Sequence, residues 1–209
     1  MTPNPADAPA DVPTDAPVDA PTGGRPDLSV EDFEELARVA PEGVTLELIN
    51  GRLKVKPVPD GDHSVIFMWL LRQCMQHRPE LDLFPEQGLI VEKYRQGHAR
   101  PDGALAPEGH MAGKPEWADP SGVLMVVEIT SHDSDTHRRD RVEKVDGYAA
   151  AAIPVYLLVD RDATTLYVLS EPENGVYRRQ ESYPFGAVVP LPAPVGIPLD
   201  TDKLKDYVS

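Results

Sequence analysis

The sequence predicts an α/β fold in which a mixed β-sheet is flanked by helices. Segments with strand-like and helix-like patterns alternate along most of the chain. Residues 123–130 are apolar almost throughout, as expected of a strand that is covered on both faces. Asn50-Gly51, between two alternating segments, predicts a β-hairpin with a type I′ turn. A chain of 209 residues is long enough for one such domain.

A tail precedes the predicted domain. Residues 1–26 consist mainly of Pro, Ala, Asp and Thr. This composition buries too little apolar surface to offset the entropy cost of ordering, so we expect the tail to be disordered. The folded domain is expected to span 27–209. The repeated prolines also leave open that the tail recruits a partner while the domain serves as a scaffold.

The predicted elements follow one another in a definite order. Ser29 is expected to cap the first helix, which Pro41 ends. The next segments are a hairpin over 45–56, a helix over 62–77, and strand-like runs over 88–92 and 100–105. The second half contains the apolar strand over 123–130, a helix over 138–152, and a hairpin over 155–160 and 165–169. Weak strand signals beyond residue 171 lie between prolines and indicate edge or covering segments.

Composition and charge limit the classes of function. The net charge of −15 repels DNA at long range, although local basic patches and bound cations can override the mean field. The one cysteine, Cys74, excludes an intrachain disulfide and is expected to be a small buried hydrophobe. No secretory signal and no apolar run of membrane-spanning length is visible in the sequence. We therefore expect a cytoplasmic protein with no membrane partner.

Glu128 is a carboxylate within the apolar strand. Burying an ionised carboxylate costs free energy unless a cation pairs with it or it binds a metal. Asp102 follows Pro101 at the edge of another extended segment, and two acids on neighbouring strands could hold Mg²⁺ for phosphodiester chemistry. In the alternative interpretation, Glu128 is a buried ion-pair partner of Lys144 and Asp102 only shapes a turn.

The helix after the apolar strand carries a lysine on a well-defined face. Asp140, Lys144 and Tyr148 are spaced i, i+4, i+8 and therefore share that face. A helix that packs back on the sheet would direct the face toward Glu128. Lys144 could instead form a surface pair with Asp140, which would contribute only ~0.3–0.5 kcal/mol.

The densest basic cluster of the chain lies at the start of the same predicted helix. Arg138, Arg139 and Arg141 are expected to bind nucleic-acid phosphates beside the acids. Cations are unfavourable near a helix N-terminus, so this placement suits a functional role. The alternative is a solvated helix start.

Several segments together resemble the Uma family, which is classed with restriction endonucleases in the PD-(D/E)xK nuclease superfamily. The resemblance covers roughly residues 30–170, in the family's order. It implies a restriction-endonuclease-like fold. The segments that carry it are Leu46-Glu47-Leu48-Ile49-Asn50-Gly51, Pro101-Asp102, Glu128-Ile129-Thr130-Ser131, Arg139-Asp140-Arg141-Val142-Glu143-Lys144 with Tyr148, and Pro154-Val155-Tyr156-Leu157-Leu158-Val159-Asp160.

The resemblance also implies a set of site residues. Asp102 and Glu128 would ligate Mg²⁺ or Mn²⁺, with help from the backbone carbonyl of Ile129. Lys144 would take the part of the motif lysine in catalysis, and Glu47 would supply a further catalytic carboxylate. By its position on the polar face of a hairpin alone, Glu47 would be a solvated residue.

One position departs from the superfamily pattern, which puts a lysine two residues after the glutamate. That position is Thr130, and the resemblance implies that the lysine has moved to Lys144 on the following helix.

The expected function is a metal-dependent endonuclease that hydrolyses DNA phosphodiester bonds and could act as a homodimer. The alternative is a catalytically degenerate nuclease-fold protein that serves as a binding or regulatory module.

Overall fold

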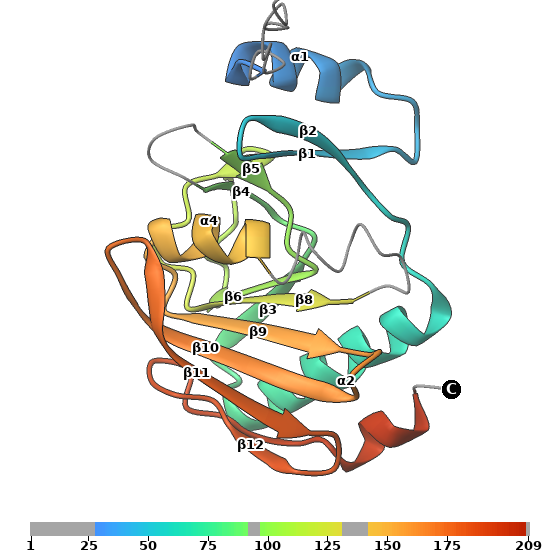
Figure 1. Cartoon of the computed structure of the whole chain (residues 1–209), viewed down its shortest axis with the longest axis vertical. Coiled ribbons are helices and arrows are strands. Elements are labelled where there is room, and N and C mark those ends of the chain that lie inside the picture. The colour runs from blue at the N-terminus through green and yellow to red at the C-terminus, as the bar shows by residue number, and fades with distance from the viewer. Residues whose placement is uncertain (1–27, 92–96, 131–141, 208–209) are drawn as a thin grey trace, which may run out of the picture.

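Two β-sheets and the helices that cover them make up the fold (Figure 1). The computed structural model describes residues 28–91, 97–130 and 142–207. One sheet has six strands in the order β11-β10-β9-β8-β6-β3, and the other has five in the order β2-β1-β5-β4-β7. Both sheets contain parallel and antiparallel pairs, which confirms the predicted α/β fold with a mixed sheet. The predicted tail, residues 1–26, lies outside the described residues.

The elements have the following bounds. The six-stranded sheet comprises β3 (Leu81–Pro85), β6 (Gly103–Pro107), β8 (Met125–Ile129), β9 (Val155–Asp160), β10 (Thr165–Glu173) and β11 (Val176–Pro184). The five-stranded sheet comprises β1 (Thr45–Ile49), β2 (Arg52–Lys56), β4 (Gly88–Val91), β5 (Gly97–Ala99) and β7 (Trp117–Ala118). The remaining elements are α1 (Val30–Val39), α2 (Gly61–His77), α4 (Lys144–Ala150), the short hairpin of β12 (Val188–Pro190) and β13 (Pro198–Asp200), and the 3₁₀ helix η2 (Asp202–Asp206).

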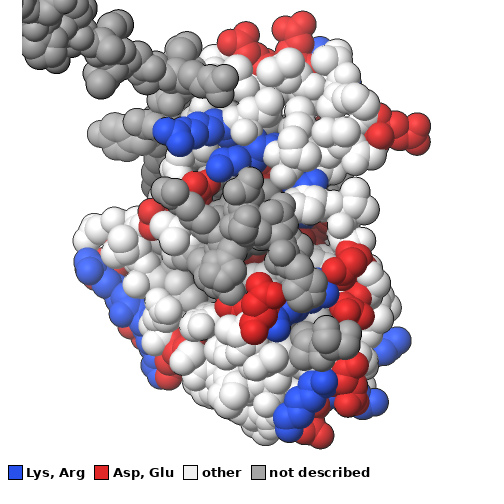
Figure 2. Space-filling model, turned by 45° about the vertical axis from the view of Figure 1, so that its right-hand side comes forward, with Lys and Arg blue, Asp and Glu red and all other residues white. Residues whose placement is uncertain are grey.

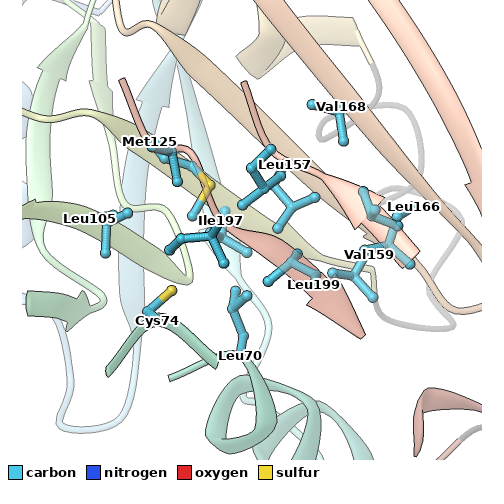
Figure 3. Packing of buried hydrophobic residues seen from close by; sticks show 14 of the residues in the cluster. Leu70, Cys74, Leu105, Met125, Leu157, Val159, Leu166, Val168, Ile197 and Leu199 are labelled. Atoms are coloured by element: carbon cyan, nitrogen blue, oxygen red, sulfur yellow. The ribbon is translucent and has the colours of Figure 1, made fainter. Parts of the chain in front are cut away.

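The centre of the six-stranded sheet is the parallel pair β8 and β9, in which Met125 is opposite Val155. Every residue of both strands is buried, as the uninterrupted apolar sequence predicts. One face of the pair packs against α2 and the C-terminal segments (Figure 3). The other face packs against α4 and against strands of the five-stranded sheet. Glu128 lies on the same face of β8 as Val126, the α4 side, whereas Val127 and Ile129 point to the α2 side.

The local signals in the first part of the chain are confirmed. Ser29 caps α1 by accepting a hydrogen bond from the Asp32 backbone N–H at 3.1 Å. Asn50 and Gly51 have φ values of 52° and 69°, the left-handed conformation that a type I′ turn requires at both positions. The helix expected over 62–77 is also present as α2, and its cap, which was not predicted, is Asp60, which accepts the His63 N–H at 2.7 Å.

Other expectations differ from the structure. The helix expected over 138–152 is described only as α4, because residues 131–141 lie outside the described residues. Strand β3 was not expected; it is a short strand that ends in Pro85, and its buried residues, Leu81 and Leu83, alternate along it. Beyond residue 171, β10 continues to Glu173 and β11 forms the sheet edge, in line with the expected edge segments.

Cys74 provides a probe of global stability. Its side chain is fully buried in the core next to α2's other apolar residues, and burial raises the pKa of the thiol to about 12. Since only the exposed thiolate reacts, a thiol reagent should label native protein at the rate of global unfolding. Labelling of one thiol per chain in urea is the positive control, and rapid labelling without denaturant would contradict the buried placement.

Candidate active site

A cluster of buried acids and bases lies where the two sheets and the N-terminal end of α4 meet. Its members come from segments far apart in the chain, and none of them is more than 6% exposed. The acids are Glu47 of β1, Asp102 just before β6 and Glu128 of β8, and the lysines are Lys56 at the end of β2 and Lys144 at the start of α4.

Lys144 joins two of the acids. Its Nζ lies 2.9 Å from Glu47 Oε1 and 3.0 Å from Glu128 Oε1. Tyr148, one turn further along α4, donates its hydroxyl to the same Glu128 oxygen at 2.6 Å. Burial and the two carboxylates raise the pKa of Tyr148 well above its ordinary value, so the phenol keeps its proton. The predicted helix face therefore does meet Glu128, while Asp140 lies outside the described residues.

Glu47 is fully buried, which its place on the hairpin alone does not predict. Strand β1 is covered on both sides: Leu48 packs under α1 with Phe33 and Trp117, and Glu47 points the opposite way, to Lys144. The Arg100 backbone N–H also donates to Glu47 Oε1, at 2.7 Å. The burial of Glu47 thus follows from the packing of its own face of β1 against α4 and the six-stranded sheet, where Ile49 of the same face also lies.

Asp102 forms the other half of the cluster. Its Oδ1 lies 2.8 Å from Lys56 Nζ, and its Oδ2 lies 3.1 Å from His63 Nε2 and accepts the Ile129 N–H at 2.7 Å. Burial alone would raise the pKa of Asp102, but the Lys56 ammonium and the His63 ring outweigh it and hold that pKa well below the usual range. Asp102 is therefore ionised at neutral pH. Asp102 contacts β8 through the backbone N–H of Ile129, the residue that follows Glu128.

Lys56 and His63 were missed by the sequence reasoning. Burial would lower the pKa of Lys56, but Asp102 and the other acids raise it overall, so Lys56 stays charged. One signal could have found it: the hairpin register places Lys54 opposite Glu47, and Lys56 shares that face of β2. For His63 the signal is weaker, since only its place in the first turn after the Asp60 cap directs it toward the cluster.

Most of the chain matches a single family. Residues 30–202 match the family Uma2, whose description reads "Putative restriction endonuclease". The chain belongs to the Uma2 family. A solved structure of a protein described as a "putative nuclease belonging to DUF820", from Anabaena variabilis, has 16% sequence identity and a TM-score of 0.63. The similarity covers 87% of this chain and 99% of that one, and it shows the shared fold. No curated protein matches the chain.

Thr130, at the position where the superfamily pattern would put a lysine, has a structural explanation in this Uma2 chain. Thr130 is fully buried, and its hydroxyl accepts a hydrogen bond from the Arg161 backbone N–H at 2.9 Å. The Arg161 guanidinium in turn lies 2.9 Å from Asp60, the residue that caps α2. Thr130 therefore links the ends of β8 and β9. A lysine at this position would lose that link.

Two groups of predicted site residues remain to be placed. The Ile129 carbonyl was predicted as a metal ligand, and the structure places the Ile129 N–H on Asp102. Arg138, Arg139 and Arg141, the predicted nucleic-acid-binding residues, lie outside the described residues. The described helices include none long and apolar enough to cross a membrane.

The donor atoms of the Uma2 cluster suit a hard divalent cation. Three carboxylates face two lysines, which leaves an excess negative charge unless His63 is protonated, and Mg²⁺ prefers such oxygen ligands. Within 28–91, 97–130 and 142–207, however, no three His, Cys, Asp or Glu side chains group closely enough to hold a metal. The lysines contact the oxygens that a cation would need. A cation that used Asp102 Oδ1 would therefore have to displace Lys56.

Replacing Lys144 should show how far the fold depends on it. In Lys144→Met, Glu47 and Glu128 lose their shared cation in a buried site. We expect the free energy of unfolding in urea to fall by about 3–5 kcal/mol, the usual cost of breaking a buried ion pair from one side. Lys203→Met, at an exposed position, should change it by less than about 0.5 kcal/mol. Similar values for both variants would contradict a structural role for Lys144.

Replacing Lys56 tests whether it competes with a metal for Asp102. The Lys56→Met variant keeps the contacts of Asp102 with His63 and Ile129 but frees Oδ1. Calorimetric titration with MnCl₂ should then show affinity that is higher by about tenfold, or roughly 1.4 kcal/mol. Adding Asp102→Asn to this variant should remove the binding. Weaker Mn²⁺ binding by Lys56→Met would count against competition.

Proposed function

We propose that this Uma2 protein is a metal-dependent endonuclease that hydrolyses DNA phosphodiester bonds. The observation that carries the proposal is the convergence of Asp102, Glu128 and Lys144 in one buried cluster, with Ile129 linking the two acids through its backbone N–H. Family membership supports the proposal, because the matched family is described in terms of restriction endonucleases.

The proposed metal ligands are Asp102, Glu128 and the carbonyl of Ile129. When bound, Mg²⁺ or Mn²⁺ would neutralise charge on the phosphate and favour ionisation of the attacking water. Asp102 is suited to this role because it is ionised at neutral pH and held in place by three contacts. Glu128 is likewise fixed, by Lys144 and Tyr148.

Lys144 would orient the attacking water or offset negative charge that develops on the phosphate. Its ammonium is well positioned for this role, since Glu47 and Glu128 hold it at 2.9 and 3.0 Å. Glu47 acts through Lys144, and Tyr148 acts through Glu128, so both would be positioning residues. Preorganised charges of this kind need no rearrangement of their own as the reaction proceeds.

Nicking of plasmid DNA tests the function directly. Purified full-length chain with Mn²⁺ or Mg²⁺ should nick the plasmid, and EDTA should stop the reaction. Asp102→Asn and Glu128→Gln should each lower the rate by at least about 100-fold, since each removes charge from the site. Asp202→Asn, which changes an exposed carboxylate far from the cluster in sequence, should cleave normally.

Two outcomes would contradict the proposal in different ways. Cleavage that survives both Asp102→Asn and Glu128→Gln would assign the activity elsewhere. Absence of cleavage together with absence of Asp102-dependent Mn²⁺ binding would favour the degenerate binding module.

A homodimer would place one site on each strand of a duplex, and light scattering with and without DNA would detect it.

A further inference from the structure

Strand β2 carries a row of three basic side chains on one face. Arg52, Lys54 and Lys56 alternate with Leu53 and Val55, so the cations share one face and the apolar residues the other. We call these three residues the β2 basic face. Successive members are about 6.6–6.8 Å apart along the strand. The row therefore presents evenly spaced positive charges on a rigid element.

The row leads from solvent into the acid cluster. Arg52 is exposed, the Lys54 side chain is 31% exposed and that of Lys56 is 5% exposed. Lys56 reaches Asp102, and Lys54 lies 3.1 Å from Glu143 at the start of α4. Arg52 makes no ion pair with any residue that the structure describes. Among the described residues, Arg52 at the outer end of the row is thus the least neutralised cation. At the inner end, Lys56 contacts Asp102, a proposed metal ligand.

We propose that the β2 basic face binds the phosphodiester backbone of a DNA strand and leads it to the acid cluster. The inference rests on the proposed function and names a part of its substrate site. A polyanion with regular charges is matched by a regular row of cations, and such contacts position a strand without reading its sequence. The long-range repulsion from a net charge of −15 makes a local basic entry necessary.

Protection of a sheet edge is the other common use of lysines on a strand such as β2, which lies at the edge of its sheet. That role is met by any charge on the strand and gives no reason for a close contact with an acid at the site. Lys56 is buried against Asp102, and Lys54 is partly buried against Glu143, so two of the three cations point inward. On the face shown in Figure 2, one group of Lys and Arg side chains lies in the upper half, at the height of β1 and β2 in Figure 1, and further groups lie in the lower half.

DNA binding can be measured apart from cleavage. Fluorescence anisotropy of a labelled short duplex in Ca²⁺, over about 50–200 mM salt, gives both the affinity and its salt dependence. We expect the double variant Arg52→Gln/Lys54→Gln to bind about tenfold more weakly and to lose about one to two units of the logarithmic salt slope. The single variant Arg52→Gln should show part of this loss, and it breaks no ion pair to any residue within 28–91, 97–130 and 142–207.

The matched control is Arg178→Gln/Arg179→Gln on β11, where both arginines are about half exposed. It makes the same change in net charge and should leave affinity and salt slope nearly unchanged. Equal losses in the two double variants, or no DNA binding by the wild-type chain, would overturn the inference.

The inference and the proposed function can fail separately. Binding that depends on β2 without metal-dependent cleavage would retain the inference and reject the nuclease. If cleavage requires Asp102 but the Arg52→Gln/Lys54→Gln variant cleaves DNA and binds it as the wild type does, the proposed function is retained and the inference is rejected. Thermal unfolding of each variant shows whether the fold is intact.

Discussion

The Lys144 ammonium is the charge on which the arrangement of the two sheets depends. It lies between Glu47 of the five-stranded sheet and Glu128 of the six-stranded sheet, and it is itself at the start of the helix that packs between them. With either acid alone the pair would be an ordinary buried ion pair. With both, one cation fixes three elements, and removing it would leave two uncompensated carboxylates in an apolar environment.

Local patterns were enough to predict the parts of the site that depend on neighbours in sequence. The Asn50-Gly51 turn, the buried strand around Glu128, and the shared face of Lys144 and Tyr148 all follow from periodicities of two to four residues. Since the connection from β8 through α4 to β9 joins parallel strands, the helix packs back on the sheet and brings that face to the glutamate. These features needed no knowledge of distant segments.

The parts that could not be predicted depend on distant packing. Glu47 is buried because its face of β1 packs against α4 and the six-stranded sheet, and nothing in the hairpin sequence encodes that contact. Lys56 and His63 reach Asp102 across long stretches of chain, so no spacing rule relates them. Even Thr130, which the superfamily pattern made conspicuous, gained its explanation only from Arg161, just after the neighbouring strand β9.

The backbone of Arg100 has a consequence for how the cluster responds to change. Its N–H bonds Glu47 and its carbonyl accepts the Lys56 ammonium at 2.8 Å, while its guanidinium stacks 4.7 Å from the centre of the Trp117 ring, outside the cluster. One peptide segment thus ties the lysine–aspartate half to the lysine–glutamate half. Mutations in the two halves will therefore couple energetically rather than add, because both halves share the Arg100 backbone.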